Sequence, residues 1–117
     1  MAQKYYTDGK SIFALVSGDE IAADLKEIKA GTTDAAAEKH VPVYEVADGV
    51  CTVTVGSVEH PMLEEHLISW ITVETDKGVY TKYLKAGQKP TVRFLLDEDE
   101  TVESVYEYCN LHRLWKA

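Results

Sequence analysis

Between residues 41 and 109 the chain consists of short apolar runs with a period of two, and this pattern constrains its fold more than any other feature. In the run 50–56, cysteine and valine alternate with threonine, as expected for a strand with one buried face. The other runs cover residues 41–46, 66–74, 79–84, 91–96 and 101–109. Turn sequences such as Asp-Gly and Asp-Lys-Gly lie between them. We therefore predict an all-β antiparallel sandwich of about six or seven short strands.

The first 37 residues are less regular and form a short N-terminal extension to the predicted sandwich. Residues 12–16 are an apolar run between Asp-Gly and Gly-Asp, which predicts a short hairpin or strand. Residues 20–29 have apolar positions four and three apart, so one or two helical turns and a strand are both admissible. Residues 31–37 are predicted to be a loop or a short helical turn that leads into the sandwich.

Length, cysteine content and charge limit the class of protein. At 117 residues the chain has the size of one domain. Its two cysteines, Cys51 and Cys109, are too few for a disulfide scaffold, so we expect reduced thiols. The sequence shows neither an export signal nor an apolar run of about 18 residues, which predicts a soluble, cytoplasmic protein. The formal charge of -8 argues against nucleic acid or an anionic membrane as a partner.

The four histidines and Cys109 form the pattern of a single metal site. Cys109-x-x-His112 places a thiol and an imidazole three residues apart near the C-terminus, as in a metal half-site. The other histidines, His40, His60 and His66, each precede or open a predicted strand. Because loops held by a rigid scaffold are where binding sites are commonly built, we expect these five side chains to lie together at one end of the sandwich.

The donor set favours a redox metal over structural zinc. Structural zinc usually has four ligands that are often rich in sulfur, whereas four imidazoles and one thiolate make five donors. Such a set leaves one position of an octahedron open. Imidazoles suit iron, copper or nickel, and a single thiolate donates charge that favours the oxidised state of the metal. We therefore expect iron.

Four segments, in this order, resemble the signature segments of the superoxide reductases, the family of the desulfoferrodoxins and neelaredoxins. They are Glu38-Lys39-His40-Val41-Pro42-Val43, His60-Pro61-Met62, Glu65-His66-Leu67-Ile68-Ser69-Trp70-Ile71 and Cys109-Asn110-Leu111-His112-Arg113-Leu114-Trp115-Lys116-Ala117. The match extends from about residue 32 to the C-terminus. A lone histidine in a loop is usually only solvated, but the combination of segments is highly specific.

The resemblance implies an immunoglobulin-like β-sandwich over residues 38–117 that binds one iron ion per chain, as Fe2+ or Fe3+. It implies a square-pyramidal iron with Cys109 as the axial ligand, and with four equatorial ligands. These are His40, His60, His66 and His112. The implied reaction is the one-electron reduction of superoxide to hydrogen peroxide without release of dioxygen, and superoxide would bind opposite the Cys109 sulfur.

By the same resemblance, Glu38 and Lys39 are the candidate catalytic residues. Glu38 resembles the family's mobile carboxylate, which occupies the sixth position of the resting ferric iron, so it is also a candidate metal ligand. Lys39 is the candidate cation that draws superoxide toward the site of an acidic protein and orders a water that supplies protons. Without the resemblance, both would be interpreted as a solvated charge pair. We also expect the backbone N–H groups of Leu111 and His112 to hydrogen-bond the ligand sulfur.

Two departures from the family pattern concern residues 1–37 and Arg113. Family members with an extra N-terminal domain bind a second iron there through four cysteines, but this chain has no cysteine before Cys51. Residues 1–37 are therefore interpreted as a candidate remnant of a desulforedoxin-like domain without its metal, and electrons would come from an external donor such as rubredoxin. Arg113 stands where a glycine is expected. Its cation would either attract the anionic substrate or lie at the rim of the site without a role. The resemblance also implies a homo-oligomer, either a dimer or a tetramer.

Two other functions are compatible with the same residues. A non-catalytic β-sandwich interaction module would use Cys109, His112 and two further histidines to hold a structural zinc ion. A superoxide dismutase would release dioxygen as well as hydrogen peroxide. Cys51, Trp70 and Trp115 are interpreted as packing residues of the core or rim.

Overall fold

The computed structural model describes residues 3–21 and 24–117, and antiparallel strands dominate these residues. The strands are β1 (Tyr5–Thr7), β2 (Ile12–Ala14), β3 (Lys26–Ile28), β4 (Pro42–Ala47), β5 (Val50–Val55), β6 (Ile68–Thr75), β7 (Val79–Tyr83), β8 (Thr91–Leu95), β9 (Val102–Cys109) and β10 (Arg113–Lys116). A four-residue helix, α1 (Ala37–His40), precedes β4. None of the described helices is long and apolar enough to cross a membrane.

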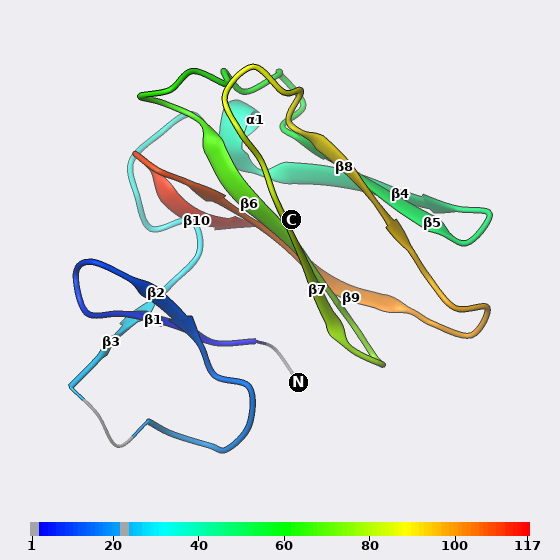
Figure 1. Ribbon diagram of the computed structural model, residues 1–117, viewed down its shortest axis with the longest axis horizontal. Coiled ribbons are helices and arrows are strands. Elements are labelled where there is room, and N and C mark those ends of the chain that lie inside the picture. Colours follow the sequence, from blue (N-terminus) through cyan, green and yellow to red (C-terminus); the bar gives the residue numbers. More distant parts are fainter. Residues whose placement is uncertain (1–2, 22–23) are drawn as a thin grey trace.

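Seven of these strands form the predicted sandwich, which confirms the all-β fold class. One sheet has the order β10-β9-β6-β7 and the other has the order β4-β5-β8, and all neighbouring strands are antiparallel. Figure 1 shows the two sheets splayed from each other, with α1 and several connections at one end. The four-stranded sheet supplies β9, which ends in Cys109, and the connection that enters β6 carries His66.

The core between the two sheets follows from the alternation in the sequence. In β5, Cys51, Val53 and Val55 are fully buried, whereas the threonines between them are half-buried. These side chains pack against Ile71 and Val105 of the facing sheet. An apolar face of this kind excludes water from both layers and supports a rigid scaffold for the loops at its end. Cys51 is therefore a core residue, as the sequence indicated.

Two strands lie where the sequence predicted none, and one helical interpretation is wrong. β10 and β1 were not predicted. The helical alternative for residues 20–29 fails over 26–28, where the chain pairs with β1 as β3. The strand alternative is confirmed there, while Ala22 and Ala23 lie outside the described residues. Pairing with β1 gives the backbone groups on one side of this short segment hydrogen-bond partners, whereas an isolated helical turn leaves most of its backbone groups unpaired.

The N-terminal segment forms its own three-stranded sheet, with the order β2-β1-β3, and packs on the outer face of the four-stranded sheet. The Tyr5 ring lies 5.5 Å from the Trp70 ring and 5.4 Å from the Tyr106 ring. The backbone N–H of Gly31 donates to the carbonyl of Leu114 at 2.9 Å. The segment is thus attached to β10, the strand that follows the Cys-x-x-His sequence.

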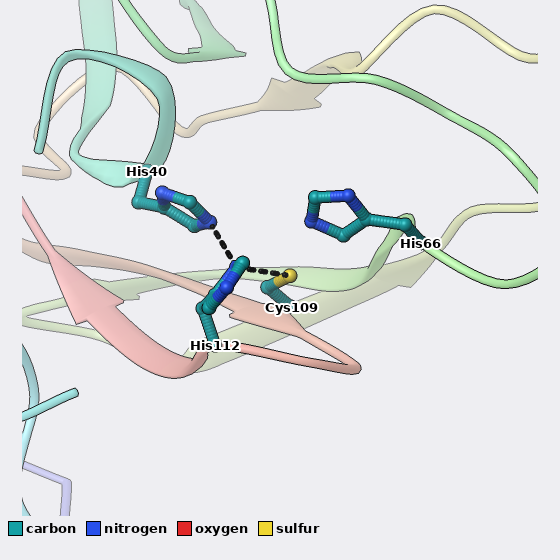
Figure 2. A group of neighbouring side chains, drawn as sticks. All are labelled: His40, His66, Cys109 and His112. Atoms are coloured by element: carbon teal, nitrogen blue, oxygen red, sulfur yellow. Dashed lines mark hydrogen bonds between the residues drawn. The ribbon is translucent and has the colours of Figure 1, made fainter. Parts of the chain in front are cut away.

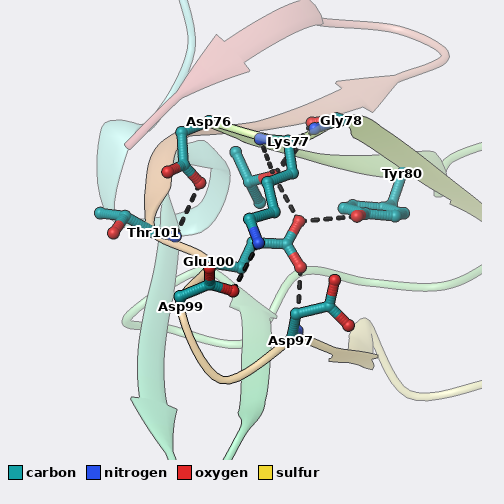
Figure 3. A network of polar contacts seen from close by, with 9 residues as sticks. Asp76, Lys77, Gly78, Tyr80, Asp97, Asp99, Glu100 and Thr101 are labelled. Carbon is teal, nitrogen blue, oxygen red and sulfur yellow. Dashed lines mark hydrogen bonds and ion pairs between the residues drawn. The ribbon is translucent and has the colours of Figure 1, made fainter.

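At the far end of β6, a polar network joins two turns of the sandwich (Figure 3). The Glu100 carboxylate accepts hydrogen bonds from the Thr75 hydroxyl, from the Tyr80 hydroxyl at 2.6 Å and from the backbone N–H of Asp97 at 3.0 Å. In the same group Lys77 pairs with Asp99. The hydrogen bonds from Thr75, Tyr80 and Asp97 lower the pKa of Glu100 below its ordinary value of 4.5, because they stabilise the ionised carboxylate.

This pKa shift predicts an acid-sensitive contribution to stability. Because the pKa of Glu100 is lower in the folded than in the unfolded chain, the contribution is present above pH 4.5 and is lost as the pH falls through the folded value. We expect Glu100→Gln to lower the melting temperature at neutral pH, and the gap from the unmodified protein to close in acid. Thermal unfolding followed by circular dichroism measures both. The exposed neighbour Glu98 offers the control Glu98→Gln, and an equal effect of that variant would contradict the assignment.

Candidate metal centre

The five predicted ligands come from three parts of the chain and converge at one end of the sandwich. His40 is the last residue of α1, His60 and His66 lie in the connection between β5 and β6, and Cys109 ends β9. His112 lies in the tight connection from β9 to β10. Figure 2 shows His40, His66, Cys109 and His112 pointing toward one another, and the candidate ligand atoms of these four lie within 4.8 Å of each other.

The four imidazoles are arranged in a closed ring. In the order His40, His60, His66 and His112, neighbouring rings have centroids 4.7 to 5.2 Å apart, and their planes are nearly perpendicular, at 76° to 87°. The opposite pair, His40 and His66, is 6.5 Å apart. The Cys109 sulfur lies 3.6 Å from Nε2 of His60 and 3.8 Å from Nδ1 of His112. Four nitrogens and one sulfur therefore face a common centre.

The hydrogen bonds behind the rings leave lone pairs directed at that centre. Nδ1 of His40 contacts the carbonyl of Ala36 at 2.8 Å, and Nδ1 of His60 contacts the carbonyl of Pro61 at 2.6 Å. A carbonyl only accepts, so each Nδ1 carries the proton and each Nε2 of a neutral ring has a bare lone pair. Yet the two Nε2 atoms lie 3.3 Å apart. Two facing lone pairs repel each other unless a cation lies between them.

Burial keeps these imidazoles neutral, which is the form that binds metals. His40 and His60 are each only 2% exposed. Burial, aided by the neighbouring imidazoles, lowers the pKa of His60 to about 4 and also lowers the pKa of His40. The pKa of His66 is lowered by burial too. Nε2 of His66 is buried without a hydrogen-bond partner among the described residues, as expected of an atom that is reserved for a metal.

The sulfur of Cys109 is buried but is supported by backbone donors. Burial raises the pKa of the thiol, whereas hydrogen bonds from the backbone N–H groups of His112 and Leu111 lower it. These two donors confirm the prediction made from the sequence. Glu107, two residues earlier on the same face of β9, is fully buried, and burial raises its pKa to about 9. Its carboxyl group is thus uncharged at neutral pH, and where it ionises its charge raises the pKa of the Cys109 thiol further.

The donor set as a whole fits a bound metal ion. It combines neutral imidazoles with fixed tautomers, one thiol with backbone donors at its sulfur, and an unpartnered buried nitrogen. Backbone carbonyls behind ligand histidines are the common second shell of metal sites. Five N and S donors exceed the four of a closed structural zinc site and suit iron better.

Asn110 fixes the two ligand loops to each other. Its side-chain oxygen accepts from the backbone N–H of Leu67 at 2.9 Å, and its side-chain nitrogen donates to the carbonyl of Glu65 at 3.1 Å. Its backbone N–H also donates to the carbonyl of Leu67 at 3.2 Å. The loop that contains His66 and the turn that contains Cys109 are therefore held in one register.

Glu38 and Lys39 lie in α1 beside His40, and both side chains are exposed. The Lys39 charge helps to lower the pKa of His40 and of His66, after the larger effect of burial, so its ammonium lies within electrostatic reach of two ligands. The carboxylate of Glu38 is not part of the group of converging ligand atoms. Its carbonyl oxygen accepts the backbone N–H of Val58 at 2.9 Å, which fixes the turn rather than the side chain.

Gly56 allows the end of β5 to approach this turn closely. A Cβ at position 56 would lie 2.6 Å from the carbonyl oxygen of Glu38 and 3.0 Å from the carbonyl carbon of Lys39. We expect Gly56→Ala to destabilise the protein by about 1–3 kcal/mol, because backbone atoms must move to accept the methyl group. Denaturant unfolding measures the change. Gly78→Ala is the matched control, since its Cβ would meet only the Tyr80 ring at 3.4 Å or more. Equal stability of both variants would contradict the assignment.

Arg113 does not extend toward the ligands. Its guanidinium donates to the hydroxyl of Tyr108 at 3.3 Å, beside a hollow that residues of the N-terminal sheet also line. Its backbone has φ of 69°, a conformation that favours glycine and explains why glycine is expected there. The structure therefore places this cation against the hydroxyl of Tyr108.

Comparison with known proteins agrees with the geometry of the site. The desulfoferrodoxin family profile matches residues 32–117. Desulfoferrodoxin of Desulfarculus baarsii is 49% identical over 94 residues, which cover 80% of this chain and 73% of the relative. The chain belongs to the desulfoferrodoxin family. Within the family, desulfoferrodoxin of Nitratidesulfovibrio vulgaris is 50% identical over 93 residues, covering 80% of this chain and 72% of that one.

Solved structures extend the desulfoferrodoxin-family likeness to the N-terminal sheet. The crystal structure of the superoxide reductase from Treponema pallidum has a TM-score of 0.86 and 37% identity, and the match covers 100% of this chain and 99% of that one. The superoxide reductase (1Fe-SOR) from Giardia intestinalis has a TM-score of 0.56 and 28% identity over 68% of this chain and 95% of that one. The T. pallidum enzyme thus shares the whole described architecture, including the segment before α1.

Proposed function

We propose that this protein is a superoxide reductase that holds one iron ion in the ring of His40, His60, His66 and His112 with Cys109. The observation that carries the proposal is the convergence of four imidazoles and one buried thiol on a single centre. Family membership and the likeness to superoxide reductases support it. The iron, when bound, supplies the one-electron reduction, so that one superoxide, one electron and two protons give one hydrogen peroxide.

The protein's own residues fix the protonation of the candidate ligands and limit the access of water to them. The carbonyls of Ala36 and Pro61 fix the tautomers of His40 and His60, and the backbone donors at Cys109 favour its thiolate form. The rings of His66 and His112 are partly exposed, whereas His40 and His60 are buried. A small anion therefore reaches the centre from the side of His66 and His112, while His40, His60 and Cys109 shield the other faces from water.

Lys39 is the proposed cation for the substrate. The protein carries a formal charge of -8, so its overall field repels superoxide. Lys39 places one positive charge within electrostatic reach of His66, one of the two partly exposed rings of the site. Its ammonium attracts the anion and holds a water that delivers protons to the reduced oxygen species. Glu38, its neighbour in the exposed turn of α1, is proposed as the mobile carboxylate that reaches the metal in the resting state.

The division of the chain is part of the same proposal. Residues 38–117 form the iron-binding unit, and residues 1–37 are a remnant of a desulforedoxin-like domain without its metal. Two observations support this: the described part of the segment forms a separate small sheet, and the chain has no cysteine before Cys51. Electrons then come from an external carrier such as rubredoxin. We further propose a cytoplasmic location, since both cysteines are unpaired as in a reducing compartment. A homo-oligomer, either a dimer or a tetramer, is proposed from the resemblance to the superoxide reductases alone.

Product stoichiometry tests the proposed reaction. Purified, iron-loaded protein is supplied with a reductant and a pulse of superoxide, and hydrogen peroxide and dioxygen are both measured. A reductase yields one hydrogen peroxide for each superoxide consumed and no dioxygen. Dioxygen released together with peroxide, without consumption of the reductant, would instead identify a dismutase.

A further inference from the structure

Trp115 of β10 contacts two of the metal-site histidines at once. Its ring lies 5.1 Å from the His40 ring, nearly parallel to it at 29°. Its indole N–H donates to the backbone carbonyl of His112 at 2.9 Å. The side chain is buried, at 6% exposure. A packing residue needs only an apolar surface, whereas here both the face and the edge of the indole engage ligand residues.

The two histidines come from distant parts of the chain. His40 ends α1, and His112 lies 72 residues later in the turn that follows β9. Their facing nitrogens, Nε2 of His40 and Nδ1 of His112, are 3.0 Å apart. Trp115 packs on the face of the first ring and hydrogen-bonds the backbone of the second residue, so it fixes their relative orientation.

We propose that Trp115 is a positioning residue of the metal centre, which holds the His40 ring and the His112 backbone in the geometry that one metal ion requires. This inference rests on the proposed metal site but not on the identity of the reaction. His40 then has two constraints on its ring: the Ala36 carbonyl at Nδ1 and the indole against its face. Loss of the indole frees the ring to rotate about its Cβ–Cγ bond, and the lone pair of Nε2 leaves the common centre.

The other tryptophan offers a matched control. Trp70 is also packed between aromatic rings, parallel to Tyr108 at 5.4 Å and 8° and 5.5 Å from Tyr5. Its stacking partners belong to β9 and β1, and neither partner is a metal-site residue. A change at Trp70 therefore disturbs the packing of the N-terminal sheet, while the faces of the ligand rings stay covered.

The test measures metal binding by Trp115→Phe, Trp115→Leu and Trp70→Phe. Metal-free protein is titrated with cobalt(II), whose visible absorption reports both occupancy and the geometry of the donors, in competition with a chelator. We expect roughly 10-fold weaker binding and an altered spectrum for Trp115→Leu, as is typical of lost second-sphere contacts. Trp115→Phe, which keeps a ring but loses the hydrogen bond, should lie between that variant and the unmodified protein. Trp70→Phe should lower the melting temperature and leave the affinity and the spectrum unchanged.

Two outcomes would overturn the inference. In the first, both Trp115 variants bind cobalt(II) with the affinity and the visible spectrum of the unmodified protein. The other is an equal loss of affinity in Trp70→Phe, which would reduce Trp115 to general packing. If Trp115→Leu does not fold, Trp115→Phe still decides whether Trp115 positions the ligand residues or serves only in general packing. Because cobalt binding requires no turnover, a failure of the proposed reductase activity would appear in the product assay and not in this titration.

Discussion

A Cys109→Ser variant is expected to lose at least about 100-fold of its superoxide reductase activity, together with any visible absorption of the oxidised protein. Changes to the second sphere alone commonly cost 10- to 100-fold, and this change removes the only sulfur of the donor set. The hydroxyl is not a thiolate donor, so the charge that favours oxidised iron is lost. Rapid-mixing kinetics with superoxide and absorption spectra measure the two effects.

The control for this variant is the other buried cysteine. Cys51 is fully buried in β5 like Cys109 in β9, but it packs in the apolar core between the sheets. Cys51→Ala should keep the activity and the spectrum and should lose only stability. In Cys109→Ser, the buried serine hydroxyl by itself lowers the free energy of unfolding by about 1–3 kcal/mol. Unfolding measurements on both variants therefore separate this loss of stability from the loss of the sulfur ligand. A Cys109→Ser protein that retains the absorption and the rate would show that the sulfur is not a ligand.

Replacement of Lys39 by alanine is expected to slow the second-order reaction with superoxide by about 10-fold or more, within the range known for electrostatic steering of charged substrates. The anion then approaches an acidic protein without a cation beside the partly exposed His66. The rate of the unmodified protein should fall as ionic strength rises. In Lys39→Ala this dependence should reverse, because salt then screens only the repulsion between superoxide and the acidic protein. Stopped-flow kinetics over a range of salt concentrations measure both.

Two further variants isolate the local charge. Lys39→Arg keeps the cation and should recover most of the rate. Lys77→Ala has the same net charge as Lys39→Ala, but Lys77 follows the far end of β6, where it pairs with Asp99. If Lys77→Ala slowed the reaction as much as Lys39→Ala, the effect would be one of net charge, and the role proposed for Lys39 would be wrong.

The sandwich and the convergence of the candidate ligands were predictable because each leaves a strong chemical signal. The alternation in β5 requires one buried face, and the structure buries it. The chain has four histidines, and all of them lie in α1 or in connections at one end of the sandwich. The spacing of Cys109 and His112 alone is a weak signal, but together with the other three histidines it indicates a metal site.

The remaining features depend on contacts that composition does not encode. β10 is only four residues long, and its strand conformation follows from pairing with β9. The carbonyls of Ala36 and Pro61, which fix the ligand tautomers, are backbone atoms that any residue would supply. The direction of the Arg113 side chain follows from the hydroxyl of Tyr108, five residues earlier on the neighbouring strand. Trp115 was interpreted as packing because stacking on His40 needs the tertiary fold.

The iron content of the purified protein, measured together with its visible spectrum before and after oxidation, tests the metal centre most directly. The geometry of four imidazoles and the Cys109 sulfur predicts about one iron per chain, bound as in a mononuclear thiolate site, and an absorption band that appears on oxidation. That band should be absent from Cys109→Ser. Stoichiometric zinc after expression in ample iron, with no band in any redox state, would contradict the reductase and favour an interaction module held together by zinc.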